Sequence, residues 1–214
     1  MSYLETKRNA IMNASSGLQP LPSEYQEVEW VGNTDGTEYI ETNYYPCEKT
    51  FTDIDIAITE SNTSDCNPWG ISASEGRLTQ FTNFTSGKGF AFHINYALNR
   101  YRDTGWIIKD IVLNQFYNIQ IQLGNLGVIV DDVDYDYSEY DFSQTMYIFK
   151  ARGRANNGGK VRFRKFDLYE NGTIVRKFVP CYRISDDEIG MYDLVTRTFF
   201  TNQGGGALTK GSDV

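Results

Sequence analysis

The chain of 214 residues contains few of the residues that build zinc centres or disulfide frameworks. Its three cysteines, Cys47, Cys66 and Cys181, are odd in number, widely spaced and form no CxxC pair. We expect them to be reduced, buried or half-buried thiols, because a disulfide framework needs cysteines in pairs. The single histidine, His93, argues against a zinc site, which takes several His or Cys ligands.

Positive charge and long apolar runs are also scarce. The formal net charge is −8, whereas a nucleic-acid partner requires clustered Lys and Arg, so we expect no nucleic acid and no anionic membrane surface as partner. No apolar run approaches the roughly 20 residues that a membrane helix needs. Charged residues such as Glu5 and Lys7 interrupt any secretory signal at the N-terminus. These absences predict synthesis in a cytoplasm without membrane insertion.

Proline is rare, whereas aromatic residues and glycine are abundant. The counts of 5 Pro, 15 Tyr, 13 Phe and 19 Gly favour strands and turns over helices. Short segments alternate with period two, as where Ile54, Ile56 and Ile58 alternate with Asp53 and Asp55. Asp53 and Asp55 are interpreted as the solvated face of a strand. The predicted strands are residues 25–31, 38–44, 51–59, 69–72, 77–84, 89–95, 106–113, 116–123, 126–130, 133–137, 146–150, 161–168, 174–180, 190–193 and 198–201. This pattern predicts an all-β, two-sheet sandwich or jelly roll.

Residues 2–14 form the one predicted helix. Ser2 and Glu5 have the spacing of a capping box, and Leu4, Ile11 and Met12 form a narrow apolar stripe. A helix this short is marginal alone in water, so it must dock on its own domain, on sister copies or on a larger assembly. We therefore divide the chain into a helical arm at residues 1–17, a linker at 18–24 and a domain at 25–214.

The closing segment contains the clearest local signals. The alternation shifts phase at Arg164-Lys165, which predicts a β-bulge. Asn171-Gly172 is the strongest hairpin signal, because both residues tolerate the positive φ of a tight turn. Residues 190–193 and 198–201 are predicted to form the last strand pair.

The two ends of the domain resemble a known family. The opening sequences LPSEYQEVEW (residues 21–30) and GTEYIET (36–42), and the closing sequences FVPCYR (178–183), IGMYDLV (189–195) and FFTN (199–202), resemble a family of phage and prophage domains. That family is similar to concanavalin A-like lectins and glucanases and is related to laminin G-like domains. The resemblance covers residues 21–45 and 165–214. Two positions differ, because Trp30 replaces the usual Tyr and Arg197 replaces the usual Gly.

The resemblance implies a jelly roll of two antiparallel sheets packed face to face, with the first and last strands adjacent. It further implies a bacteriophage virion protein of the tail, fibre or capsid surface, made in the bacterial host cytoplasm. We expect its lectin-like domain to adhere to a host-surface glycan. Residues 1–20 would attach it to phage particle proteins and to sister copies, with a homotrimer as the working expectation. The alternative is a structural capsid decoration, head-fibre or tail component that binds no sugar.

Candidate ligand residues lie in the middle of the chain, where the resemblance extends only to the strand pattern. Sugar binding in such folds uses aromatic faces with nearby amides, and the candidates are Trp69, Asn95, Tyr96, Asn99, Tyr101 and Trp106. Each aromatic among them is alternatively a core residue. Asp131, Asp132 and Asp134 fit either a calcium site or an acidic outer strand. The paired Glu residues around an Asp that glucanases of this fold use are missing, so we expect no enzyme and no obligatory cofactor.

Overall fold

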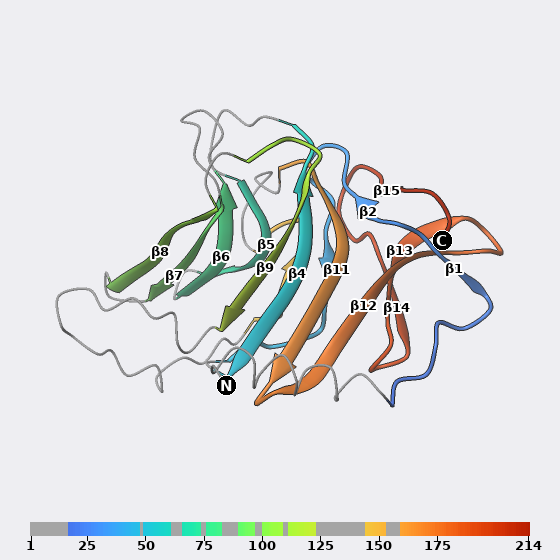
Figure 1. Cartoon of the computed structure of the whole chain (residues 1–214), viewed down its shortest axis with the longest axis horizontal. Helices are drawn as coiled ribbons and strands as arrows, with labels where there is room; N and C mark the ends of the chain where they lie inside the picture. Colours follow the sequence, from blue (N-terminus) through green and yellow to red (C-terminus); the bar gives the residue numbers. More distant parts are fainter. Residues whose placement is uncertain are drawn as a thin grey trace.

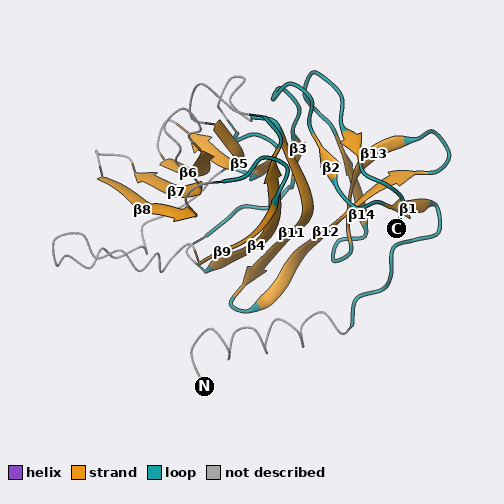
Figure 2. Ribbon diagram, turned by 45° about the horizontal axis from the view of Figure 1, so that its top comes forward, coloured by secondary structure: helices purple, strands orange, loops and turns teal. Residues whose placement is uncertain are grey.

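The computed structural model describes residues 17–47, 49–60, 66–73, 76–82, 90–96, 100–108, 111–122, 144–152 and 159–214. All regular elements within these ranges are β-strands, and they form one sheet of nine strands and one of six (Figure 1, Figure 2). The predicted all-β class and the two antiparallel sheets are therefore confirmed. The predicted helix at residues 2–14 lies outside the described residues.

The nine-stranded sheet is organised around its longest hairpin. β11 (Val161–Glu170) pairs along one side with β12 (Thr173–Arg183) and along the other with β4 (Thr50–Ile58), which in turn pairs with β9 (Phe116–Gln122). Beyond β12 follow β13 (Glu188–Asp193) and β14 (Thr198–Thr201). The short strands β1 (Tyr25–Glu27), β2 (Val31–Gly32) and β15 (Thr209–Lys210) complete the sheet.

The six-stranded sheet is a simple antiparallel series. Its order is β3 (Ile40–Glu41), β10 (Tyr147–Ile148), β5 (Cys66–Ala73), β6 (Gly76–Thr82), β7 (Phe90–Tyr96) and β8 (Arg100–Ile108). Among the described strands β8 is at the edge of this sheet, and the β7–β8 hairpin lies at the opposite end from β3 (Figure 2). The strand predicted at residues 89–95 is β7, whereas the strand predicted at 106–113 is present only at its start, because β8 begins at Arg100 and ends at Ile108 and residues 111–113 are not in a strand. β7 and β8 form one antiparallel hairpin.

The hydrophobic core lies between the two sheets. Alternation along β4 and β11 directs Ile54, Ile56, Phe163 and Phe166 inward, where all four are buried. Trp69 of the smaller sheet meets Phe166 of the larger edge to face, with 5.9 Å between ring centroids. Edge-to-face pairs of this kind are favoured over face-to-face stacking because of the ring quadrupole. The contact shows that the sheets pack face to face.

Both predicted irregularities of β11 and β12 are present. The register between β11 and β4 shifts between Phe163 and Lys165, which confirms the bulge. The hairpin turns at Asn171 and Gly172, whose φ angles of 51° and 79° are those of a type I′ turn. The predicted last pair is also present as β13 and β14.

Two predicted strands near the N-terminus are much shorter than expected. The segment 25–31 breaks after Glu27, because β1 pairs with β12 whereas β2 pairs with β11 and β15. The segment 38–44 keeps only Ile40–Glu41 as a strand. Glu38 instead turns inward, where its carboxylate accepts hydrogen bonds from the backbone N–H groups of Thr34 and Gly36. A buried carboxylate needs such donors, so the loop curls around Glu38 instead of extending.

The two ends of the domain lie side by side. The bridge between Val28 and Asp213 and the pairing of β2 with β15 join them, and the C-terminus lies beside β1 in both views (Figure 1, Figure 2). This agrees with the adjacency of first and last strands that the family resemblance implied.

Candidate functional site

A polar cluster lies on the outer face of the nine-stranded sheet, the face of β9, β4, β11 and β12 opposite the core. Asp53 of β4 and Asp167 of β11 are direct cross-strand partners there. The next cross-strand pair is Ile54, which follows Asp53, and Phe166, which precedes Asp167, and both belong to the core. Because strand side chains alternate, the two carboxyl groups share the outer face. Asp55, Asn118 and Lys165 complete the group, which we call the Asp53–Asp167 cluster.

Both carboxylate oxygens of Asp53 have strong partners. Nζ of Lys165 lies 2.6 Å from Oδ2, and Nδ2 of Asn118 donates to Oδ1 over 2.8 Å. The same amide donates to Asp55 over 2.6 Å. Asp53 retains only 3% of its surface exposed, so the prediction of a solvated face is wrong for this residue. The ammonium and the amide replace the water that an exposed carboxylate would bind.

Asp167 is buried to the same degree, but its carboxyl group has few hydrogen-bond donors. Its Oδ2 lies 3.8 Å from Nζ of Lys165, beyond hydrogen-bond distance. Among the described residues, Oδ1 has no hydrogen-bond partner. Burial raises the pKa of Asp167 to about 7, although Lys165 and Lys177 act to lower it. Asp167 is therefore the member of the pair whose neutral form suits its surroundings.

The surroundings of Lys165 favour its charged form, in contrast to those of Asp167. Burial lowers the pKa of Lys165, but the hydrogen bond to Asp53 and the charges of Asp167, Asp53 and Asp55 outweigh burial, so the pKa is raised overall. The ammonium is accordingly held in its charged form by the carboxylates around it. In chemical terms the cluster combines a fixed ion pair with a carboxyl group that exchanges a proton near neutral pH.

A second polar feature surrounds Tyr39, which directly precedes β3, and Tyr147 of β10. The rings of Tyr39 and Tyr147 stack with 4.4 Å between centroids and 8° between planes. Lys150 lies over the Tyr39 ring and Arg152 over the Tyr147 ring, at 5.3 and 5.2 Å from the centroids. Rings this close leave no room for a cation between them, so the cations cover the outer ring surfaces. Glu41 accepts from Arg152 over 2.8 Å and fixes the guanidinium.

The structure separates the predicted sugar-binding residues. Trp69 has no exposed surface and belongs to the core, so its ring cannot meet a ligand. Four of the others lie on the β7–β8 hairpin, where Asn95 pairs with Tyr101 and Tyr96 pairs with Arg100, while Trp106 pairs with Ala91. Asn99 lies outside the described residues. The register thus brings the remaining candidates onto one edge hairpin.

The other predicted sites lie where the structure gives no description. Asp131, Asp132 and Asp134, proposed for calcium, and Leu4, Ile11 and Met12, proposed for anchoring, are outside the described residues. In the part that is described, no group of three or more His, Cys, Asp or Glu side chains could hold a metal ion. No helix in the described ranges has the length and apolarity of a membrane span. Cys47 and Cys181 are free thiols as expected, and burial raises the pKa of Cys181 to about 12.

The sequence contained a partial signal for the Asp53–Asp167 cluster. Charged residues alternate with apolar ones in both strands, at Asp53 and Asp55 and again at Lys165 and Asp167. That spacing places each pair on one face of its strand. It does not reveal that β4 and β11 are neighbours, because Lys165 and Asp53 are 112 positions apart in the chain and no local turn joins the two strands.

Comparison with known proteins adds no family assignment. No protein-family model matches the chain, and neither the curated proteins nor the solved structures contain a match.

Proposed function

We propose that this chain is a bacteriophage virion protein whose lectin-like domain adheres to a glycan on the host surface. The resemblance of residues 21–45 and 165–214 to phage domains of the concanavalin A-like class motivates the proposal. The face-to-face antiparallel sheets and the adjacent chain ends support a jelly roll of that class. Residues 1–20 would attach the domain to the particle, and several copies would strengthen weak single-site binding through avidity.

The register of the β7–β8 hairpin is the observation that carries the glycan assignment. It brings Asn95, Tyr96, Tyr101 and Trp106 onto one hairpin at the edge of the smaller sheet. Aromatic rings provide apolar surface for pyranose faces, and amides provide hydrogen bonds for sugar hydroxyls. The aromatic candidates elsewhere are less suitable, because Trp69 is buried and the Tyr39–Tyr147 rings are covered by cations.

A glycan array probed with the full-length protein tests the proposal. We expect binding to a subset of bacterial surface glycans, and a loss of at least about tenfold in affinity for Asn95→Ala and Tyr101→Ala, since one buried aromatic or hydrogen-bonding contact is worth about 1.4 kcal/mol or more. The controls are Tyr45→Ala and Gln115→Ala, which alter exposed residues outside the hairpin. No binding by the wild type, or equal losses in the controls, would contradict the assignment.

The structural alternative is a decoration, head-fibre or tail component without sugar binding. It is favoured by the way cations of the described region stack on rings, as Arg162 does on Trp30 at 4.1 Å and Lys210 on Tyr182 at 4.3 Å. Such contacts occupy aromatic surface that a ligand would otherwise use. If the protein bound no glycan on the array but was incorporated into phage particles, this alternative would be supported. Deletion of residues 1–20 should abolish incorporation under either proposal.

We do not propose catalysis for the carboxylate pair. Asp53 and Asp167 each keep 4% of their side chains exposed, and glycoside hydrolysis needs both carboxyl groups to reach the scissile bond. Their burial favours a role inside the fold, independent of what the domain binds.

A further inference from the structure

The Asp53–Asp167 cluster holds more negative charge than its donors neutralise. Asp53, Asp55 and Asp167 are the carboxylates, and Lys165 and Lys177 are the ammonium groups that act on them. Like charges directly opposite each other on neighbouring strands destabilise a sheet, and Asp53 and Asp167 are such a pair. One additional proton would bring the charges of the cluster into balance.

The hydrogen bonds indicate where that proton resides. Asp53 uses both oxygens, one toward Lys165 and one toward Asn118. Among the described residues Oδ1 of Asp167 has no hydrogen-bond partner, Oδ2 has a long contact to Lys165, and the Tyr169 hydroxyl is the one donor that acts on the carboxyl group. A buried carboxylate with so few donors is far less stable than the neutral acid. The geometry therefore assigns the ion-pair role to Asp53 and the protonated role to Asp167.

We propose that Asp167 is a proton-binding site that couples the pairing of β4, β11 and β12 to pH, so that the domain is held more firmly in mildly acidic than in alkaline solution. Loss of the proton places a second carboxylate opposite Asp53. The strain falls on the centre of the nine-stranded sheet, where β11 pairs with both β4 and β12. The inference does not depend on what the domain binds.

Each strand around Asp167 contributes a charged or polar group that acts on the Asp53–Asp167 cluster. β4 presents Asp53 and Asp55, and β12 presents Lys177 opposite Asp167. β11 itself presents Lys165 and the hydroxyl of Tyr169, which also acts on Asp167. β9 contributes the neutral amide of Asn118, which bonds Asp53 and Asp55. The two ammonium groups stabilise one carboxylate well, but they do not supply Oδ1 of Asp167 with a donor.

The direction of the pH effect follows from proton linkage. Asp167 has a pKa of about 7 in the folded chain and an ordinary value of 3.8, so the folded state binds the proton more tightly than the unfolded state. Stability from this group is greatest below the ordinary value and is lost as the pH rises toward and through 7. Between pH 5.5 and 8.5 the folding equilibrium constant should fall by roughly thirtyfold, because each unit of pKa difference is tenfold.

Two measurements on the full chain test the proposal. The first is an NMR titration of aspartate carboxyl carbons, in which the Asp167 signal should show a midpoint within about one unit of pH 7, against about 4 for an ordinary aspartate. A midpoint below 5 would overturn the proposal without any variant having to fold.

The second measurement is urea unfolding of wild type and Asp167→Asn between pH 5.5 and 8.5. The amide is a neutral substitute for the protonated acid, so the variant should lose the roughly thirtyfold pH dependence and exceed wild type in stability at pH 8.5. The control is Asp186→Asn, which alters an exposed carboxylate paired with Arg183 and should keep the wild-type dependence. An unchanged pH dependence in Asp167→Asn would refute the role of Asp167.

Discussion

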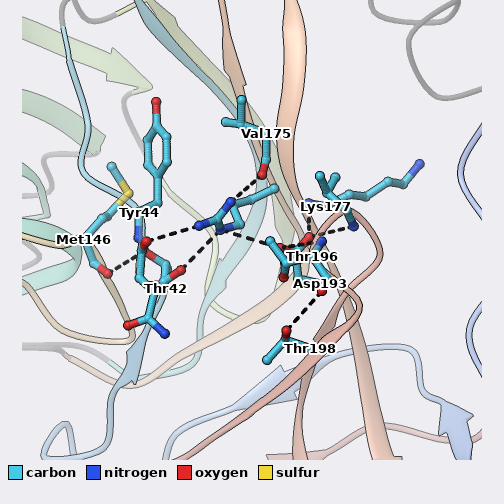
Figure 3. A network of polar contacts seen from close by, with 11 residues as sticks. Thr42, Tyr44, Met146, Val175, Lys177, Asp193, Thr196 and Thr198 are labelled. Carbon is cyan, nitrogen blue, oxygen red and sulfur yellow. Dashed lines mark hydrogen bonds and ion pairs between the residues drawn. The ribbon is translucent and has the colours of Figure 1, made fainter.

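At the scale of single residues, buried Asp193 organises the end of the closing sequence. Its carboxylate accepts hydrogen bonds from the backbone N–H groups of Lys177 at 2.8 Å and Val195 at 3.0 Å and from the hydroxyl of Thr196 at 2.7 Å. Figure 3 shows Lys177 and Thr196 beside Asp193. Arg176 lies 3.5 Å away and also donates to the backbone oxygens of Thr42 and Asn43. Asp193 thus links β12, the β13–β14 turn and the segment after β3.

We predict that Asp193→Ala lowers the free energy of unfolding by about 3 kcal/mol. The change leaves partly buried backbone donors and the Arg176 guanidinium without their acceptor, and breaking a buried ion pair from one side costs about 3–5 kcal/mol. Urea unfolding monitored by fluorescence measures the loss. Asp186→Asn, at an exposed ion pair, should leave the midpoint nearly unchanged; a comparable loss in both variants would refute the linking role.

At the scale of elements, two turns show how backbone conformation selects residues. The β11–β12 turn uses Asn171 and Gly172, which tolerate positive φ. The β13–β14 turn places Arg197 at a φ of 58°, at the position where the resembled family has Gly. Arg197 is kept there by other contacts, because its guanidinium donates to the oxygen of Pro20 over 3.0 Å and lies over the ring of Tyr192. Those contacts fasten the linker at residues 18–24 to the domain.

The free-energy cost of a side chain at positive φ at position 197 can be measured by comparing two substitutions. Arg197→Gly and Arg197→Ala both remove the guanidinium, but only Ala keeps a Cβ that disfavours positive φ. We expect Arg197→Gly to be more stable than Arg197→Ala by about 1 kcal/mol in the free energy of unfolding. Chemical denaturation of the two variants gives the difference. Equal stability would mean that the turn relaxes out of the left-handed region.

At the scale of the whole molecule, the last residues close the nine-stranded sheet against the first. β15 pairs with β2, and further backbone hydrogen bonds connect the two ends. These run from Glu29 to Ser212, from Gly211 to Trp30 and from Val214 to Glu27. Leu208 is buried just before β15. The domain therefore depends on both of its ends.

We predict that ending the chain at residue 206 lowers Tm by about 10 °C or more. The truncation removes β15 and the buried Leu208 side chain, which together are worth about 3–5 kcal/mol, and 1 kcal/mol corresponds to about 2–4 °C in a chain of this size. Ending it at residue 211 keeps both and should cost much less. Circular dichroism melts measure the two values, and equal Tm for the full chain and the chain ending at residue 206 would show that closure contributes little.

The sequence predicted well those features that depend on neighbouring residues. The hairpin at Asn171-Gly172 and the bulge at Arg164-Lys165 follow from turn chemistry and from the phase of alternation, both of which are local. The strand at 51–59 was equally readable. The segments 25–31 and 38–44 were overextended, because sheet pairing and the burial of Glu38 limit them, and neither is encoded in alternation.

For the candidate sites, too, the sequence predicted local features but not those that depend on tertiary packing. The sequence could name aromatic and acidic residues, but it could not say that Trp69 is buried or that Tyr39 and Tyr147 stack between two cations. By itself the sequence determined the all-β class, the principal turns and the separation of charged from apolar faces, since these follow from residues a few positions apart. Only the tertiary structure decided that Asp53 lies opposite Asp167, because which strands become neighbours depends on packing across the whole chain. That pairing buries two carboxyl groups together, and it turns an ordinary alternating strand into a site that binds a proton.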